Sequence, residues 1–177
     1  MKKIYIVLTY TGTILSKLIK IYTKNEFSHV SISLDKDLNK MYSFGRLNPY
    51  NPFIGGFVHE HLDSGTFRRF KKTKTQIYYL EISDKQYSEL ETILLNFKEK
   101  RKQYTFNVIG LFAVSIKLKI KVKKVFYCAE FVKYVLDKSN IKTELPDIIK
   151  PEDFKNLKGI KEIYNGILND YKNYQYM

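Results

Sequence analysis

The segment Phe126-Tyr127-Cys128-Ala129-Glu130-Phe131-Val132 contains the only cysteine of the chain, where a helix is predicted to begin. Residues 126–139 are expected to form this helix, because its apolar side chains follow the i, i+3, i+4, i+7, i+8 spacing of a buried helix face. The N–H groups and the dipole of a helix N-terminus stabilise a thiolate and can hold an oxyanion. Cys128 is therefore either a nucleophile or a small core side chain, since free cysteine is among the most buried residue types.

A histidine that could activate Cys128 lies about a hundred residues earlier. Residues 27–34 alternate as a strand, with His29 on the face opposite the apolar side chains, and residues 41–46 alternate in the same way. These two runs predict a hairpin whose face of small residues receives the Cys128 helix, so that His29 reaches the sulfur. A Cys–His pair creates a nucleophile and then protonates the leaving group. A third group must fix the tautomer of the ring. Ser43 is the candidate, because it lies on the matching face of the paired strand. The alternative is an exposed His29 without a chemical role.

The remaining sequence pattern predicts one α+β domain that spans residues 1–177. Further strands are expected at residues 3–10, 57–61, 67–70, 76–82 and 160–167. Helices are expected at residues 13–24, 84–103 and 105–116, and a short one begins at Pro151. Residues 117–124 alternate lysine with apolar residues, which indicates an exposed basic strand or connection.

The chain is strongly basic, with 31 Lys+Arg against 18 Asp+Glu and a net charge of +13. Such a charge favours polyanionic partners, namely nucleic acid, anionic lipid or wall polymers. Biased base composition explains it equally well, because Lys, Ile, Asn and Tyr are all abundant.

The location of the protein is predicted from its apolar runs and its cysteine content. One cysteine excludes an intramolecular disulfide. No apolar run approaches the roughly 20 residues of a membrane span, and the N-terminal run lacks a signal cleavage site. We expect a cytoplasmic protein without a transmembrane segment, for which peripheral membrane contact stays open.

Two further groups of side chains have the composition of possible binding sites. His59-Glu60-His61 supplies two imidazoles, one fewer than the three protein ligands of a catalytic zinc, so no metal and no cofactor is expected. Arg46, Arg68 and Arg69 could hold an anionic substrate, although arginines on strands are more often solvated.

Three motifs together resemble a known family. Residues 27–35, residues 41–44 and residues 127–132 are similar in type and order to the circularly permuted branch of the NlpC-type, papain-like cysteine hydrolases. Bacterial YiiX-like proteins and the lecithin:retinol acyltransferase group share this order. The resemblance implies a permuted papain-like fold, with an antiparallel sheet or partial barrel packed against helices. It also implies Cys128 as nucleophile and His29 as base. The third polar residue of the family falls on Ser43, where Glu or His is commoner.

These observations predict a cysteine hydrolase or acyltransferase that acts on an amide or ester. The expected substrate is a small molecule, peptide or lipid, preferably anionic, rather than nucleic acid. One alternative is a catalytically weak or inactive member that serves as a basic binding module for nucleic acid or anionic lipid. Another is a structural domain in which Cys128 belongs only to the core.

Overall fold

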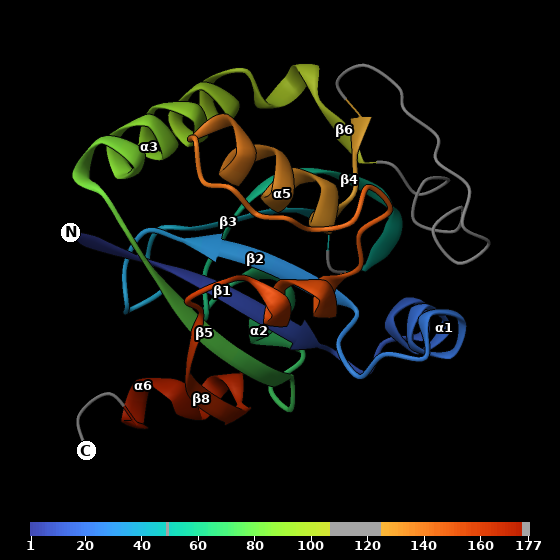
Figure 1. The fold of residues 1–177 in the computed structure, drawn as a ribbon. Coiled ribbons are helices and arrows are strands. Elements are labelled where there is room, and N and C mark those ends of the chain that lie inside the picture. Colours follow the sequence, from blue (N-terminus) through green and yellow to red (C-terminus); the bar gives the residue numbers. More distant parts are fainter. Residues whose placement is uncertain (49, 107–124, 175–177) are drawn as a thin grey trace.

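The computed structural model describes residues 1–48, 50–106 and 125–174, and a six-stranded antiparallel sheet forms its centre (Figure 1). The strand order is β4-β3-β2-β1-β5-β8, so β4 and β8 are the two edges of an open sheet. The strands are β1 (Lys2–Tyr10), β2 (His29–Ser33), β3 (Met41–Asn48), β4 (Asn51–Glu60), β5 (Lys74–Ile82) and β8 (Lys161–Ile167). The expectation of a mixed fold built on an antiparallel sheet is confirmed.

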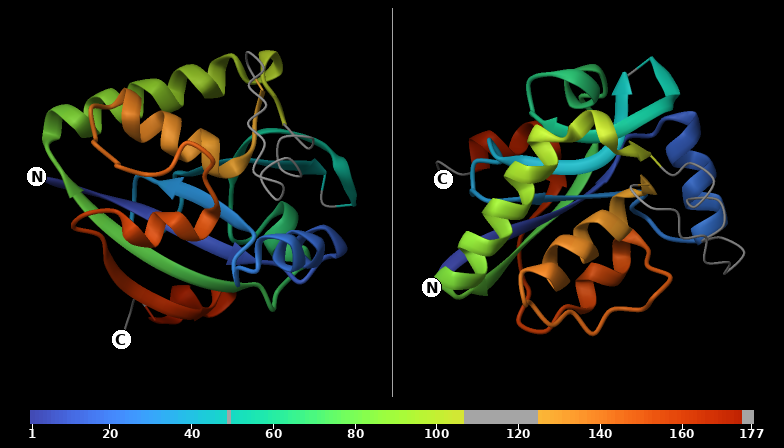
Figure 2. Two further views of the ribbon diagram at one scale, coloured as in Figure 1. Left: turned by 45° about the vertical axis from the view of Figure 1, so that its right-hand side comes forward. Right: turned by 90° about the horizontal axis from the view of Figure 1, so that it is seen from above.

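The main core lies on the sheet face that carries Val30, Ile32 and Phe44. Helices α3 (Asp84–Glu99) and α5 (Cys128–Lys138) cover this face, as Figures 1 and 2 show. The fully buried Phe131 ring of α5 lies 5.0 Å from the Phe44 ring, measured between centroids. The apolar stripe that predicted α5 is thus the surface by which the helix is anchored.

A second, smaller core lies on the opposite face of the sheet. It joins residues of β1 and β3 to Phe67 of α2 (Gly65–Arg69) and to Tyr171 of α6 (Tyr171–Tyr174). The small-residue face of the β2–β3 hairpin belongs to this side. The prediction that this face receives the Cys128 helix is therefore wrong. Helix α5 packs on the bulky face instead, because burying apolar side chains against each other outweighs close backbone approach.

Shorter elements connect these layers. Helix α1 (Ile14–Thr23) begins after Thr13, whose hydroxyl accepts a hydrogen bond from the N–H of Ser16 at 3.3 Å. The other elements are η1 (Arg101–Gln103), the parallel pair β6 (Thr105–Phe106) and β7 (Val125–Phe126), η2 (Pro151–Asn156) and η3 (Leu168–Asp170). In the parts of the chain that the structure describes, no helix has both the length and the apolar character to cross a bilayer.

The largest differences from the sequence expectations occur at three places. The strand expected at residues 67–70 is wrong, because the chain forms α2 there, and only Phe67 of this helix is buried. The strand expected at residues 57–61 overlaps the end of β4, a ten-residue edge strand that closes at Glu60. Thr105 and Phe106, the first two residues of the helix expected at 105–116, form the strand β6 instead. The remainder of that expected helix, and the connection at residues 117–124, lie outside the described residues.

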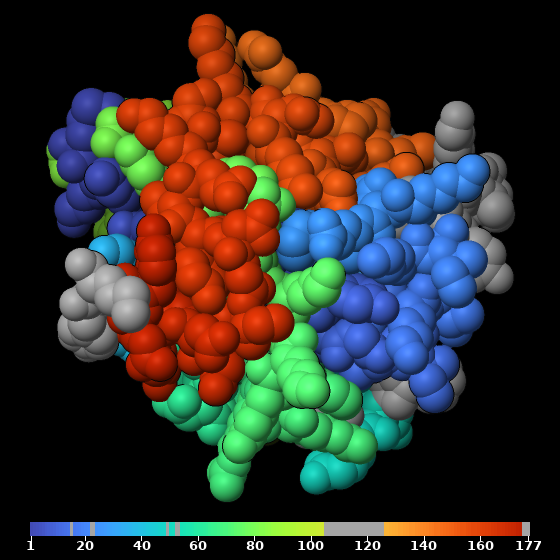
Figure 3. All heavy atoms as spheres, turned by 90° about the horizontal axis from the view of Figure 1, so that it is seen from below, coloured from blue at the N-terminus to red at the C-terminus, as the bar shows by residue number. Residues whose placement is uncertain are grey.

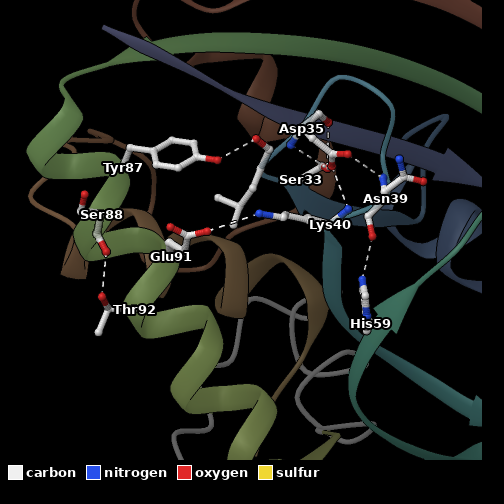
Figure 4. A network of polar contacts seen from close by, with 10 residues as sticks. Ser33, Asp35, Asn39, Lys40, His59, Tyr87, Ser88, Glu91 and Thr92 are labelled. Atoms are coloured by element: carbon white, nitrogen blue, oxygen red, sulfur yellow. Dashed lines mark hydrogen bonds and ion pairs between the residues drawn. The ribbon is translucent and has the colours of Figure 1, made fainter.

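The turn between β2 and β3 is fixed by a polar network (Figure 4). Asp35 accepts hydrogen bonds from the backbone N–H groups of Asn39, at 3.1 Å, and Lys40, at 2.7 Å. The Lys40 ammonium lies 3.5 Å from the Glu91 carboxylate of α3, and His59 Nε2 donates to the Asn39 carbonyl at 2.8 Å. The turn is thereby tied to α3 and to β4.

Candidate active site

A small cavity lies where β1 ends, β2 begins and the first turn of α5 arrives. Its volume is about 60 Å³, well below the roughly 300–1,000 Å³ of sites that enclose a whole small molecule. A cavity of this size accepts a reacting group rather than an entire substrate. Polar and charged side chains that line the cavity include those of Thr13, Ser16, His29, Arg46, Glu60 and Cys128.

His29 and Glu60 meet across the strand that separates them. His29 is the first residue of β2 and Glu60 is the last residue of β4, with β3 between them. Cross-strand pairing of Met41 with both Ser33 and Glu60 places Glu60 on the same face as His29. Glu60 Oε1 lies 3.0 Å from His29 Nε2, and the Ser31 hydroxyl donates to Glu60 Oε2. The carboxylate therefore orients the imidazole through one ring nitrogen.

The charges of this pair stabilise each other despite their burial. Burial by itself lowers the pKa of His29, but the Glu60 carboxylate and hydrogen bonds to Cys128 and Glu60 raise it to about 10. Burial likewise opposes ionisation of Glu60, yet the His29 charge and hydrogen bonds from neighbouring side chains lower the pKa of Glu60. The side chains are only 22% and 11% exposed, so solvent screens them weakly. An imidazolium–carboxylate pair results at neutral pH.

Cys128 reaches the same cavity from the main core. It is the first residue of α5 and is 2% exposed. Its side chain lies beside His29 at the cavity, and this proximity contributes to the raised pKa of His29. Because Glu60 engages Nε2, Nδ1 is the ring nitrogen left for the sulfur. The structure thus brings Cys128 and His29 together, as the sequence predicted, although α5 approaches from the other face.

Ser43 does not hold the His29 ring as the sequence suggested. Its hydroxyl is buried and has no hydrogen bond of normal geometry among the described residues. Ser43 Oγ is still close enough to Glu60 to contribute to the lowered pKa of that carboxyl group. The contact with Nε2 belongs to Glu60, which the sequence analysis weighed only as part of His59-Glu60-His61.

The feature that identifies Glu60 is the pairing of β4 with β3 rather than the sequence of either strand alone. Extending β4 back through Gly55 and Gly56 gives a strand whose pairing with β3 places Gly56 opposite Gly45. This register puts Glu60 on the face of Ser43 and His29. Gly55 and Gly56 are typical of a loop, so the sequence alone predicts a shorter strand, at residues 57–61.

Arg46 supplies a positive charge to the cavity wall. Its guanidinium is partly buried, packs 5.6 Å from the centre of the Phe70 ring, and forms no ion pair with any acid in the described residues. Burial and the neighbouring Arg69 lower the pKa of Arg46, whereas Glu60 raises it. Arg68 and Arg69 are exposed and do not line the cavity.

His59 lies in β4 and His61 directly follows that strand, and both point to the same surface region. The rings of His59 and His61 lie 4.2 Å apart between centroids, and His59 is already bonded to the Asn39 carbonyl. Across residues 1–48, 50–106 and 125–174, no group of three or more His, Cys, Asp or Glu side chains is placed to hold an ion.

Comparison with known proteins adds no relative. No protein-family model matches the chain, and no curated protein matches it. The assignment of chemistry therefore rests on the geometry of Cys128, His29 and Glu60.

Proposed function

We propose that this protein is a cysteine-dependent hydrolase or acyltransferase of permuted papain-like fold, which cleaves an amide or ester. The observation that carries the proposal is the meeting of Cys128, His29 and Glu60 at one cavity. A thiol, an imidazole and an orienting carboxylate are the three parts of a nucleophilic site.

The proposed reaction has two steps. The Cys128 thiolate attacks the carbonyl carbon, and the His29 imidazolium donates its proton to the departing amine or alcohol as the C–N or C–O bond breaks. Water, or an acceptor alcohol or amine, then attacks the thioester while His29 takes its proton, and the sulfur leaves as a thiolate. The N–H groups of the first turn of α5 are aligned to stabilise the negative oxygen in both steps.

The charge of the cavity wall favours an anionic substrate. The Arg46 guanidinium forms no ion pair in the described part of the chain, and the nearby Glu60 carboxylate is already engaged by His29. A carboxylate or phosphate close to the scissile bond would give Arg46 a partner.

Alkylation of the only cysteine tests the proposal directly. At about pH 6, Cys128 should react with iodoacetamide at least tenfold faster than free cysteine, because His29 holds a proton and stabilises the thiolate. The rate is measured by intact-protein mass spectrometry, with Cys128→Ser as the unlabelled control. The His29→Ala variant should lose the excess rate while retaining its circular dichroism spectrum. A wild-type rate no faster than that of free cysteine would exclude the nucleophile.

The net charge of +13 favours a second candidate, a basic binding module for nucleic acid or anionic lipid without turnover. This candidate requires salt-sensitive binding that survives Cys128→Ala, together with a Cys128 that shows no enhanced alkylation.

A further inference from the structure

Helix α1 carries an apolar stripe that faces solvent. Ile14 is 80% exposed, Leu18 39% and Ile21 69%. At about 100° per residue these three positions fall within about 60° of each other around the helix. The opposite side of α1 holds the buried Ser16 and Ile19, so the exposed stripe is not the surface by which the helix packs.

Lysines flank the apolar stripe. Lys17 and Lys24 are exposed, Lys20 is partly exposed, and α1 contains no acidic residue. Glu26 follows the helix, but its carboxylate lies 3.4 Å from the Lys74 ammonium. The surface of α1 is therefore apolar along one line and cationic beside it, the composition of a helix that lies in a membrane interface.

This surface borders the cavity of Cys128. Thr13, Ser16 and Ile19 from the start and inner side of α1 line the cavity, and Arg46 of β3 lines it from another direction. Further exposed apolar side chains occur near the β3–β4 turn, where Leu47 is 57% exposed and Tyr50 77%. Figures 1 and 2 show that turn at the same end of the molecule as α1, and in Figure 3 the residues of α1 form one edge.

We propose that α1, together with the β3–β4 turn, docks this protein on an anionic phospholipid bilayer and holds the Cys128 cavity at the membrane surface. Charge complementarity identifies the occupant, since exposed lysines beside bare apolar side chains match anionic headgroups above acyl chains. The docking surface stands independently of the thiol chemistry. The added statement that the substrate comes from the bilayer rests on the proposed function. It agrees with a cavity of about 60 Å³, which admits a scissile bond while the rest of a lipid stays in the membrane.

Vesicle binding tests the proposal. Full-length protein is sedimented with extruded vesicles of phosphatidylcholine alone, or of phosphatidylcholine mixed with phosphatidylglycerol. Binding to the mixed vesicles should exceed binding to the neutral ones and should fall with added salt. The double variant Ile14→Asn/Ile21→Asn should bind at least about tenfold more weakly, because the side chains that enter the acyl region become polar. Lys17→Gln/Lys24→Gln should weaken binding by roughly tenfold.

The matched control is Leu95→Asn. Leu95 is 49% exposed on α3, which both ribbon figures place away from α1, so this variant should bind like the wild type. Binding is repeated with Cys128→Ala, which should leave it unchanged and separates this proposal from the catalytic one. The proposal is overturned if wild-type protein stays in solution with the mixed vesicles, or if the isoleucine variant binds as tightly as the wild type. It is also overturned if light scattering shows that Ile14 and Ile21 hold two copies of the chain together.

Discussion

The His29 ring is held through Nε2 by Glu60 and also interacts with Cys128, so a change at Glu60 is expected to reach the sulfur. Glu60→Gln keeps the shape of the side chain but removes the charge that stabilises the imidazolium. We expect the alkylation rate of Cys128 at neutral pH to fall on the order of a hundredfold. Its pH profile should also shift, because His29 loses its proton at lower pH.

Ser43→Ala provides the matched comparison for Glu60→Gln. Removing a hydroxyl that has no hydrogen bond of normal geometry should change the alkylation rate less than about threefold. A larger effect for Ser43→Ala than for Glu60→Gln would return the orienting role to Ser43.

The raised pKa of His29 also makes folding stability depend on pH. The folded pKa of about 10 lies above the ordinary 6.5, so the stabilisation is full below about pH 6.5 and is lost as the pH rises toward 10. The lowered pKa of Glu60 acts in the opposite range, because its contribution is present above about pH 4.5 and is lost on acidification.

The measurement is urea unfolding of wild type and His29→Gln at several pH values. The difference in the free energy of unfolding should be largest between about pH 4.5 and 6.5 and should shrink toward pH 10. The side chains that act on the His29 ring are those of Glu60, Cys128 and Ser31. A difference that stays constant with pH would contradict the charged pair.

Two members of the site, Cys128 and His29, could be predicted from the sequence, whereas the third, Glu60, could not. Cys128 and His29 are each recognisable, because the first heads a predicted helix and the second lies on the polar face of a predicted strand. Glu60 depended on the register of β4 against β3, and strand register is a property of paired strands that one strand's sequence does not fix.

Among the elements, the β3–β4 hairpin positions the site through its two facing glycines. A Cβ added to Gly45 would lie 3.3 Å from His29 Cε1, whereas one added to Gly56 would meet Leu47 and the Tyr104 carbonyl at 3.4 Å. Gly45→Ala should therefore displace the His29 ring and lower the alkylation rate of Cys128 at least about tenfold. Gly56→Ala, its cross-strand partner, should leave that rate within about twofold. Equal losses of alkylation rate in the two variants would show that the effect comes from distortion of the hairpin rather than from displacement of the His29 ring.

Elements with a clear apolar pattern were predicted well, whereas the short helix α2 was missed. The apolar stripes of α3 and α5 and the continuous β-rich run of β1 specify those elements locally. Residues 67–70 contain a single buried side chain, Phe67, so neither a helical nor a strand period is established there. The side on which α5 packs was also missed, because that choice depends on the total apolar area of each sheet face.

In the whole molecule, the second core connects the end of the chain to the β2–β3 turn. Tyr171 is fully buried, and its hydroxyl donates to the Lys36 carbonyl at 3.1 Å. Tyr171→Ala should lower the free energy of unfolding by about 3–5 kcal/mol, measured by urea unfolding. Tyr174→Ala, on the same helix but 49% exposed, should cost less than about 1 kcal/mol. Similar losses in both variants would mean that the second core contributes little.

Cys128 belongs to the layer of helices above the sheet, whereas Glu60 and the side chains around it belong to the other face. The sulfur and its partners come together only after both layers have closed on the strands. Since the chain carries a single thiol, the onset of rapid labelling during refolding would report when the two halves have assembled. The labelling rate of Cys128 can thus be used as a kinetic probe of the last stage of folding, independently of any substrate.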